Sequence, residues 1–349
     1  MDKKGRETHL LIIRLSAMGD VAMTVPVISA LLAKYPNIRI TVLTKKQFLP
    51  IFSGLNRVYV FEADVKNRHK GLMGLWRLYK ELKTLHFDAV ADLHNVLRSR
   101  ILKKYVALDR IPFVQLDKGR KEKGELTRTK NKIFRQLKST HQRYADVFGR
   151  LGFPINLDDV KLLERQALSD KLVDLVQPDT KKWVGIAPFA AHEGKMYPLG
   201  QMERVVESLC NTDKYKILLF GGGANEVEQL ERISAAYPNT LCMAGKLTLA
   251  EELQLISNLD VMLSMDSGNA HLAANYGIPV ITVWGVTHPF AGFYPFGQPL
   301  ENALMANREH FPLIPTSIYG NKFPKGYEKA METIEPQEII DKLLRVLEA

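Results

Sequence analysis

Short apolar runs recur along the chain, and longer segments with helical spacing of apolar positions separate them. A short apolar run bounded by polar or turn residues predicts a buried strand. The expected strands cover 9–15, 38–43, 58–61, 88–93, 183–187, 216–220, 261–265 and 280–284. The expected helices cover 21–34, 72–85, 201–209 and 226–235. This alternation predicts an α/β protein with doubly wound, largely parallel sheets.

The chain divides into two series of such elements. Its 349 residues exceed what one hydrophobic core usually supports, so two domains are expected. We expect an N-terminal Rossmann-like domain over 1–175, a C-terminal one over 176–330, and a ligand cleft between them. The segment 298–326 is rich in Pro, Gly and Asn and is expected to be largely irregular. A helix with an apolar face starts at Pro336. We expect the segment 331–349, which contains this helix, to pack back on the N-terminal domain.

Composition bears on location. No apolar run approaches the roughly eighteen residues that a membrane span needs. The segment 1–6 is basic, but the apolar stretch behind it is too short for a signal peptide. The cysteines, Cys210 and Cys242, stand in helix and strand contexts, which favours buried reduced thiols. We therefore expect a cytoplasmic protein.

Charge is distributed unequally along the chain. The net charge is +10, but residues 1–170 hold 33 Lys+Arg against 17 Asp+Glu, whereas residues 171–349 hold 15 against 21. Within 118–143 there are ten Lys+Arg and two Glu, in what we expect to be a loop leading into a basic helix. A basic half predicts contact with an anionic partner, such as a phosphorylated lipid surface or nucleic acid. A basic surface that serves only solubility is the alternative.

The most informative stretch is Asp266-Ser267-Gly268-Asn269-Ala270-His271, between the expected strand 261–265 and a helix that ends before Gly277. A glycine with small polar neighbours at a strand-to-helix turn lets backbone N–H groups face a phosphate. Asp and Ser in this position are also typical capping residues. Both interpretations stay open on these residues alone.

Three more residues occupy corresponding places after strands. Asp20 follows the first strand at a helix start, where a carboxylate acts as a cap or accepts a proton from a substrate hydroxyl. Lys195, in the loop after strand 183–187, is either simply solvated or set against a diphosphate. Glu226 follows Gly221-Gly222-Gly223 and is either a helix cap or an acceptor for ribose hydroxyls. The first turn lacks the G-x-G-x-x-G pattern, which disfavours a nicotinamide dehydrogenase.

With these residues in place, the chain resembles glycosyltransferase family 9, the heptosyltransferases that act on the lipopolysaccharide inner core. The resemblance spans nearly the whole length. Its motifs are Arg14-Leu15-Ser16-Ala17-Met18-Gly19-Asp20, Lys195-Met196-Tyr197-Pro198 and the Asp266 to His271 stretch, in that order.

The resemblance implies a GT-B fold and inverting transfer of heptose from ADP-heptose to a lipid-linked acceptor, with no metal needed for the chemistry. It implies that Asp20 is the catalytic base and that Lys195 contacts the donor phosphates. It implies that Glu226 contacts the ribose and that Ser267, Gly268 and His271 form the phosphate-binding turn. Asp266, being negative, is expected to organise this turn or to reach a sugar hydroxyl.

The expected partners are the nucleotide-sugar donor, an anionic lipid-linked saccharide acceptor and, peripherally, the inner membrane surface. Nucleic acid is not expected, because the basic segment lacks interleaved aromatic residues. Two departures from the family pattern leave the identity of the sugar open: Ala190 and Ala191 replace hydroxyl residues, and Tyr197 stands where Trp is common. The alternatives are a GT-B transferase that uses another nucleotide sugar for capsule or O-antigen, and a noncatalytic sugar-nucleotide-binding protein.

Overall fold

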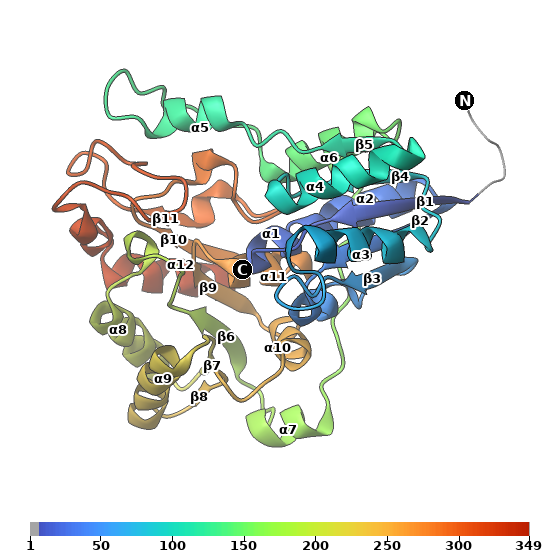
Figure 1. Ribbon diagram of the computed structural model, residues 1–349. Coiled ribbons are helices and arrows are strands. Elements are labelled where there is room, and N and C mark those ends of the chain that lie inside the picture. Colours follow the sequence, from blue (N-terminus) through green and yellow to red (C-terminus); the bar gives the residue numbers. More distant parts are fainter. Residues whose placement is uncertain (1–6, 349) are drawn as a thin grey trace. The chain divides into compact units, whose positions relative to one another are not determined.

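The computed structural model describes residues 7–348, so the basic segment 1–6 considered above lies outside the described residues. It contains two parallel sheets, each in its own compact unit (Figure 1). Unit 1 comprises residues up to 119 together with 139–163, and unit 2 comprises 120–138 together with 164 onwards. The predicted α/β class with two Rossmann-like sheets is confirmed.

Unit 1 is built on a five-stranded sheet in the order β3-β2-β1-β4-β5. The pairs are parallel, and the register places Ile13 on β1 level with Leu43 on β2 and Asp92 on β4. Successive residues of β1 point to opposite faces of the sheet, and all of them from His9 to Ile13 are buried. Both faces of the sheet are therefore covered, as in other parallel sheets. Its strands are β1 (Thr8–Ile13), β2 (Ile38–Thr44), β3 (Val58–Glu62), β4 (Ala89–Asp92) and β5 (Phe113–Gln115). Its helices are α1 (Met18–Ala22), α2 (Thr24–Lys34), α3 (Gly71–Lys83), α4 (Leu97–Val106) and α6 (Thr140–Arg150).

Unit 2 is built on a six-stranded sheet in the order β11-β10-β9-β6-β7-β8, again with parallel pairs. Its strands are β6 (Lys182–Ala187), β7 (Tyr215–Leu219), β8 (Thr240–Cys242), β9 (Val261–Met265), β10 (Val280–Trp284) and β11 (Ala303–Met305). Its helices are α5 (Arg120–Thr127), α7 (Asp170–Val176), α8 (Leu199–Cys210), α9 (Ala224–Ala236), α10 (Leu249–Ile256), α11 (Gly268–Asn275) and α12 (Pro336–Glu348). Both cysteines are free and buried.

The long strands and helices lie where the apolar pattern predicts them. The differences concern short elements. The helix expected over 21–34 is divided at Met23, where the hydroxyl of Thr24 donates to the carbonyl of Val21 at 2.7 Å. The strands β5, β8 and β11 were not expected, because three residues each are too few to produce a periodic signal.

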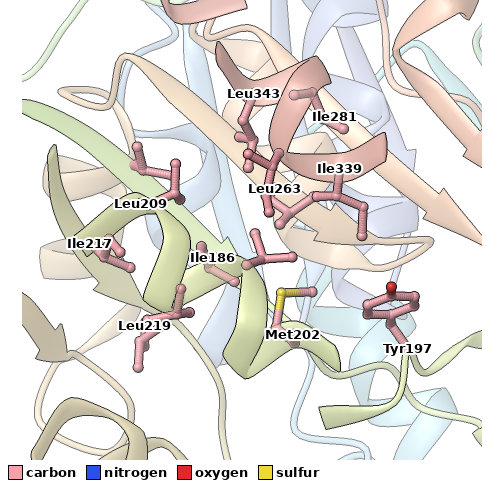
Figure 2. Packing of buried hydrophobic residues seen from close by; sticks show 14 of the residues in the cluster. Ile186, Tyr197, Met202, Leu209, Ile217, Leu219, Leu263, Ile281, Ile339 and Leu343 are labelled. Carbon is pink, nitrogen blue, oxygen red and sulfur yellow. The ribbon is translucent and has the colours of Figure 1, made fainter. Parts of the chain in front are cut away.

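The terminal helix α12 packs on unit 2, not on the N-terminal domain as expected. Its apolar face joins a cluster that includes residues of β6, β7, β9, β10 and α8. Figure 2 shows Ile339 and Leu343 of α12 beside Leu263 and Ile281 of the sheet. The amphipathic pattern of α12 predicted that the helix is packed, but it does not encode which sheet receives it.

The basic segment 120–138 also belongs to unit 2, although the residues on either side of it belong to unit 1. Leu126 and Leu137 are buried in a small apolar cluster with Ala291, against which Phe134 and Phe290 pack. The backbone N–H of Leu137 donates to the carbonyl of Phe290 at 2.9 Å. The expected boundaries 1–175 and 176–330 therefore differ from the units of the structure, because tertiary packing of a few apolar residues assigns this basic segment to unit 2.

Candidate functional site

The order of the strands in unit 2 defines where a ligand site is expected. From β6 the chain proceeds through β7 to β8 on one side, and from β9 through β10 to β11 on the other. The carboxyl ends of β6 and β9 therefore flank a topological switch point, the usual ligand site of an open α/β sheet. The loop that carries Lys195 follows β6, and the turn that starts at Asp266 follows β9.

Lys195 and Asp266 form a buried ion pair at this switch point. The ammonium of Lys195 lies 2.8 Å from Oδ2 of Asp266 and donates to its backbone carbonyl at 3.1 Å. The same Oδ2 accepts a hydrogen bond from the hydroxyl of Thr287, after β10, at 3.0 Å. The side chain of Asp266 is 8% exposed and that of Lys195 is 15% exposed. Asp266 thus organises the turn and connects three strand ends, while Lys195 keeps access to solvent.

Close packing fixes the aliphatic part of Lys195. A Cβ atom built on Gly320, whose φ is +76°, would lie 2.6 Å from Cγ of Lys195. The hydroxyl of Ser317 holds this turn by accepting the backbone N–H of Gly320 at 3.0 Å. On the other side, a Cβ on Gly194 would lie 2.4 Å from Val286. The close approach requires glycine at both positions, and few conformations remain for Lys195.

The N-terminus of α11 lies directly after Asp266. Ser267 is the N-cap residue, but its side chain accepts no hydrogen bond from the helix and instead lies 3.0 Å from the hydroxyl of Ser264. Gly268 is the first helical residue, and His271 is buried within the first turn. The simple capping interpretation of Ser267 therefore does not hold. The first-turn N–H groups, with the positive end of the helix dipole, lie beside the Lys195–Asp266 pair.

Glu226 lies in the first turn of α9, after β7. Its Oε2 accepts the backbone N–H of Gly222 at 2.8 Å, so in this structure the carboxylate caps the glycine turn. Gly223, the N-cap residue, has a φ of +93°, a conformation that glycine adopts readily. Glu226 follows the strand next to β6 on the side away from β9. It therefore shares the carboxyl edge of the sheet with Lys195 but belongs to a separate turn.

Unit 1 has an equivalent switch point between β1 and β4. Asp20, in the first turn of α1 after β1, forms an ion pair through Oδ2 with Nη2 of Arg14. The same Oδ2 accepts the N–H of Ala17 at 3.3 Å, so Asp20 also caps α1. Among residues 7–348 the other oxygen, Oδ1, has no hydrogen-bond partner. The side chain of Asp20 is 27% exposed, whereas that of Arg14 is 7% exposed.

Residues after β4 hold Arg14 in place. Nη1 of Arg14 donates to the carbonyl of Leu93 at 2.7 Å. The backbone N–H of Leu15 lies 3.4 Å from Nδ1 of His94. Burial, followed by the positive charges of Arg14 and Lys118, lowers the pKa of His94 to about 3, so this imidazole is neutral near pH 7. His94 therefore adds no charge to the surroundings of Asp20.

The structure brings Lys195, Asp266, Ser267, Gly268 and His271 to one switch point and places Glu226 on the same edge of that sheet. Asp20 belongs to unit 1, where it lies after β1 at the carboxyl edge of the other sheet. Sequence reasoning assigned no role to Arg14, Thr287 and His94. Arg14 could have been found, since a charged residue directly after a buried strand needs a nearby partner.

Tyr197, one of the two departures from the family pattern, lies in the hydrophobic core of unit 2 (Figure 2). Its hydroxyl donates to the carbonyl of Ile334 at 2.6 Å, just before α12. This residue therefore joins the loop after β6 to the segment that leads into the terminal helix. Tyr197 is 3% exposed, so its side chain is part of the core that supports this loop.

Residues 7–348 contain neither a helix suited to span a membrane nor a group of side chains suited to bind a metal ion. No helix in this range is both long enough and apolar enough to cross a membrane. In the same range, no three His, Cys, Asp or Glu side chains are grouped so that they could hold a metal ion.

Two curated proteins similar to this chain are named as lipopolysaccharide heptosyltransferases. The lipopolysaccharide core heptosyltransferase OpsX of Haemophilus influenzae is 27% identical over 333 residues, which cover 92% of this chain and 87% of the relative. Lipopolysaccharide heptosyltransferase 1 of Pseudomonas aeruginosa is 25% identical and covers 83% of this chain and 82% of its own length.

Two solved structures show the same fold. A glycosyltransferase family 9 protein from Veillonella parvula superposes with a TM-score of 0.74 at 18% identity, covering 98% of both chains. The E. coli heptosyltransferase WaaC, solved with ADP, superposes with a TM-score of 0.69 at 18% identity, covering 97% of this chain and all of that one. The predicted GT-B fold is thereby confirmed.

The sequence profile of glycosyltransferase family 9 (heptosyltransferase) matches residues 75–325, well over half of the chain. The match includes the loop of Lys195, the turn of Asp266 and the elements that support both. The chain belongs to glycosyltransferase family 9, the heptosyltransferase family.

Proposed function

We propose that this protein is an inverting glycosyltransferase that moves a heptose from ADP-heptose to a lipopolysaccharide inner-core acceptor. The observation that carries the proposal is the switch point of unit 2, where Lys195 is held on Asp266 beside the N-terminus of α11. A lysine and a helix N-terminus at one strand edge suit a diphosphate group. The relatives named above supply the identity of the sugar and of the acceptor.

The donor diphosphate is bound, in this proposal, by Lys195, by the backbone of Ser267 and Gly268 and by the first turn that includes His271. Asp266 orients Lys195 through the ion pair between the carboxylate and the ammonium. Glu226 exchanges its contact with Gly222 for the ribose hydroxyls of the nucleotide. Together these groups stabilise the negative charge that develops on departing ADP. No metal ion takes part in this stabilisation.

Asp20 is the proposed base that removes the proton from the attacking acceptor hydroxyl. Its Oδ2 is occupied by Arg14 and by the N–H of Ala17, which leaves Oδ1 to accept the proton. Arg14 is a positioning residue, because it contacts the carboxylate and the carbonyl of Leu93. Inversion follows if the hydroxyl attacks the anomeric carbon on the face opposite to the leaving diphosphate.

The acceptor is proposed to be an anionic, lipid-linked saccharide that unit 1 meets at the inner membrane surface. Exposed apolar side chains lie at the starts of α3 and α4, namely Leu72, Met73 and Leu97. Exposed lysines and arginines accompany them on both helices. These are Lys70, Arg77, Lys80, Lys83, Arg98, Arg100, Lys103 and Lys104. Apolar side chains among basic ones fit an anionic lipid surface, and a cytoplasmic protein with such a face would bind the membrane peripherally.

A transferase with another nucleotide sugar is the second candidate. Ala190 and Ala191, which replace hydroxyl residues of the family pattern, lie in the loop after β6, at the switch point. Loss of two hydroxyls near the donor changes the groups available to recognise a sugar or a phosphate. The choice between sugars is therefore a matter for direct competition between donors.

The experiment supplies ADP-heptose, or a panel of UDP-sugars, together with heptose-deficient core acceptor, and follows nucleotide release and product mass. A product heavier by one heptose, formed only with ADP-heptose, is expected. Turnover of UDP-sugars alone would replace the heptose assignment by the second candidate. Binding of nucleotide sugars without turnover of any would indicate a noncatalytic binder.

A further inference from the structure

A cluster of basic side chains lies at the carboxyl edge of unit 2, beyond the residues that hold the donor. It consists of the basic residues Lys132, His288 and Arg308 together with the ring of Phe134, and we call it the Arg308 cluster. His288 follows β10 and is the next residue after Thr287, which contacts Asp266. Arg308 follows β11, the neighbouring strand. The other two members come from the basic segment 120–138 that packs on this unit.

Arg308 is held in a fixed orientation without an acidic partner. Its Cζ lies 3.5 Å from the centre of the Phe134 ring, and its Nε donates to the carbonyl of Ile314 at 3.0 Å. No carboxylate within 7–348 forms an ion pair with it, and neither of its terminal nitrogens has a hydrogen-bond acceptor there. A guanidinium stacked on an aromatic ring, with its two terminal nitrogens unused, is prepared for an oxyanion.

His288 offers a further donor. Its ring packs edge-on against Phe134, with centroids 5.0 Å apart, and Nδ1 accepts the backbone N–H of Phe290 at 3.1 Å. Burial, followed by the charges of Arg308 and Lys132, lowers the pKa of His288 to about 4, so the ring is neutral at pH 7. Since Nδ1 accepts, the single proton resides on Nε2, which is then a hydrogen-bond donor. No acceptor for Nε2 is found among the described residues.

Lys132 has a different part in the cluster. Its ammonium donates to the carbonyls of Leu126, Leu313 and Pro315 at 3.0, 2.7 and 2.7 Å, so all three of its protons are used. It joins the basic segment to the loop after β11 and keeps Phe134 under Arg308. Its charge also adds to the positive potential. Lys132 is therefore a positioning residue, whereas Arg308 and His288 have free donors.

We propose that Arg308 and His288 bind an oxyanion carried by the acceptor saccharide, a phosphate monoester or a carboxylate, beside the donor site. The inference rests on the proposed function for the identity of the ligand, but not for the existence of the anion site. The Arg308 cluster belongs to other elements than Lys195 and α11 but lies at the same edge of the sheet, which an acceptor must approach to reach the donor sugar. Fixing its anionic group would help to orient the attacking hydroxyl.

The first test uses inorganic phosphate as the probe and calorimetry as the readout. Phosphate is titrated into protein saturated with ADP, so that the diphosphate site is already occupied. The variants are Arg308→Gln and, as the matched control, Arg345→Gln, which removes an exposed arginine of α12. We expect Arg308→Gln to weaken phosphate binding about tenfold or more, and Arg345→Gln to leave it unchanged. Equal affinity in the Arg308 variant and the wild type, or no phosphate binding by the wild type, would overturn the inference.

ADP affinity provides the folding control and separates the two proposals. Arg308→Gln is expected to bind ADP as the wild type does, and Arg308→Lys, which keeps the charge but not the planar fork, to bind phosphate with intermediate affinity. Failure of the wild type to bind ADP would contradict the proposed function instead. Acetate titrated in the same way distinguishes carboxylate from phosphate chemistry.

The second test identifies the source of the oxyanion. Transfer is measured with intact acceptor, with acceptor treated with phosphatase, and with acceptor whose carboxylates are esterified. Removal of the recognised group should raise the KM of the acceptor for the wild-type enzyme. Arg308→Gln should raise the KM of the intact acceptor by about the same factor. The variant with the treated acceptor should show no further increase, because both changes remove the same contact. Fully additive effects with both treated acceptors would show that Arg308 does not contact the acceptor anion.

Discussion

The two switch points of this protein carry the same kind of ion pair in opposite orientations. In unit 1 the cation, Arg14, is the buried partner and the carboxylate of Asp20 is the more exposed one. In unit 2 the carboxylate of Asp266 is the more buried partner and the ammonium of Lys195 is the more exposed one. Each sheet thus anchors one charge and presents the other at its carboxyl edge.

The difference indicates what each unit offers to a substrate. A carboxylate with one occupied and one free oxygen suits proton removal from a hydroxyl, whereas an ammonium beside a helix N-terminus suits a diphosphate. The anchoring partners need not touch substrate, because their function is to fix the presented group. Substitutions at the two switch points should therefore have different consequences.

The largest effect is expected for Asp20→Asn. The amide can still accept the N–H of Ala17 and keeps the volume of the side chain, but it cannot take the proton of the acceptor. We expect kcat for heptose transfer to fall by about 10³-fold, within the usual range for loss of a general base. Asp170→Asn, in the first turn of α7, is the matched control and should transfer at the wild-type rate. A kcat within about threefold of wild type would remove Asp20 from the chemistry.

Lys195→Ala should lower kcat/KM for the donor by about 10²-fold, because the diphosphate loses a charge-assisted contact in both ground and transition states. It should also lower the free energy of unfolding by about 3 kcal/mol, since Asp266 then remains buried without its cation. Thermal unfolding and initial rates measure the two effects. Lys181→Ala breaks a surface pair with Asp213 and should change neither by much.

The proposed contact of unit 1 with the membrane surface predicts an intermediate effect. Replacing Leu72 and Met73 by serine should weaken binding to vesicles that contain anionic lipid by about tenfold, because the area lost to the lipid is apolar. Co-sedimentation with such vesicles measures the affinity. Leu300→Ser, an exposed leucine of unit 2, is the control. If the double variant and the control bind alike, the start of α3 is not the contact.

Thr287→Val should have a smaller effect on donor binding. The variant removes the hydroxyl that donates to Asp266 but keeps the shape of the side chain. Because Thr287 acts on ADP only through Asp266, we expect ADP affinity to fall by about fivefold, which corresponds to about 1 kcal/mol. Calorimetry measures it, and Thr212→Val, which loses a hydroxyl that donates to the carbonyl of Leu209 before the amino end of β7, provides the comparison. An unchanged affinity would show that Lys195 alone is enough to hold Asp266.

The smallest effect on transfer at neutral pH is expected for His94, whose contribution is to the pH dependence of stability. The pKa of His94 is lowered to about 3 in the folded protein, so the unfolded state binds the proton first as the pH falls below the ordinary value of 6.5. Stability should therefore decrease between about pH 6.5 and pH 3, with a slope from this group of at most about 1.4 kcal/mol per pH unit. Denaturant unfolding of the wild type and of His94→Gln should show a shallower acid slope in the variant. Parallel slopes would mean that His94 is not buried in a neutral form.

The sequence predicted the strands that carry the site but not how the side chains are paired. Strand ends at Met265 and Trp284 follow from uninterrupted apolar runs, and they put the Asp266 turn at a sheet edge. The pairing of Arg14 with Asp20 depends on the conformation of the turn after β1. The pairing of Lys195 with Asp266 depends on strand order, which joins segments 71 residues apart. Nothing local encodes such an approach.

The basic segment 120–138 illustrates the same limit. Its charge predicted an anionic partner, but its packing depends on Leu126, Phe134 and Leu137, which are spread among lysines and arginines without a periodic pattern. Sequence distance placed the segment in the first domain, whereas apolar contacts place it in unit 2. Charge patterning therefore gave the surface character of this segment, and only the tertiary structure gave its location.

The central claim is that Asp20 acts on the acceptor and Lys195 on the donor. Calorimetric titration of ADP into Asp20→Asn and Lys195→Ala, side by side with the wild type, tests it most directly. We expect Asp20→Asn to bind ADP within about twofold of the wild type and Lys195→Ala to bind it at least about tenfold more weakly. Weaker binding by both variants to the same extent, or by neither, would contradict the claim.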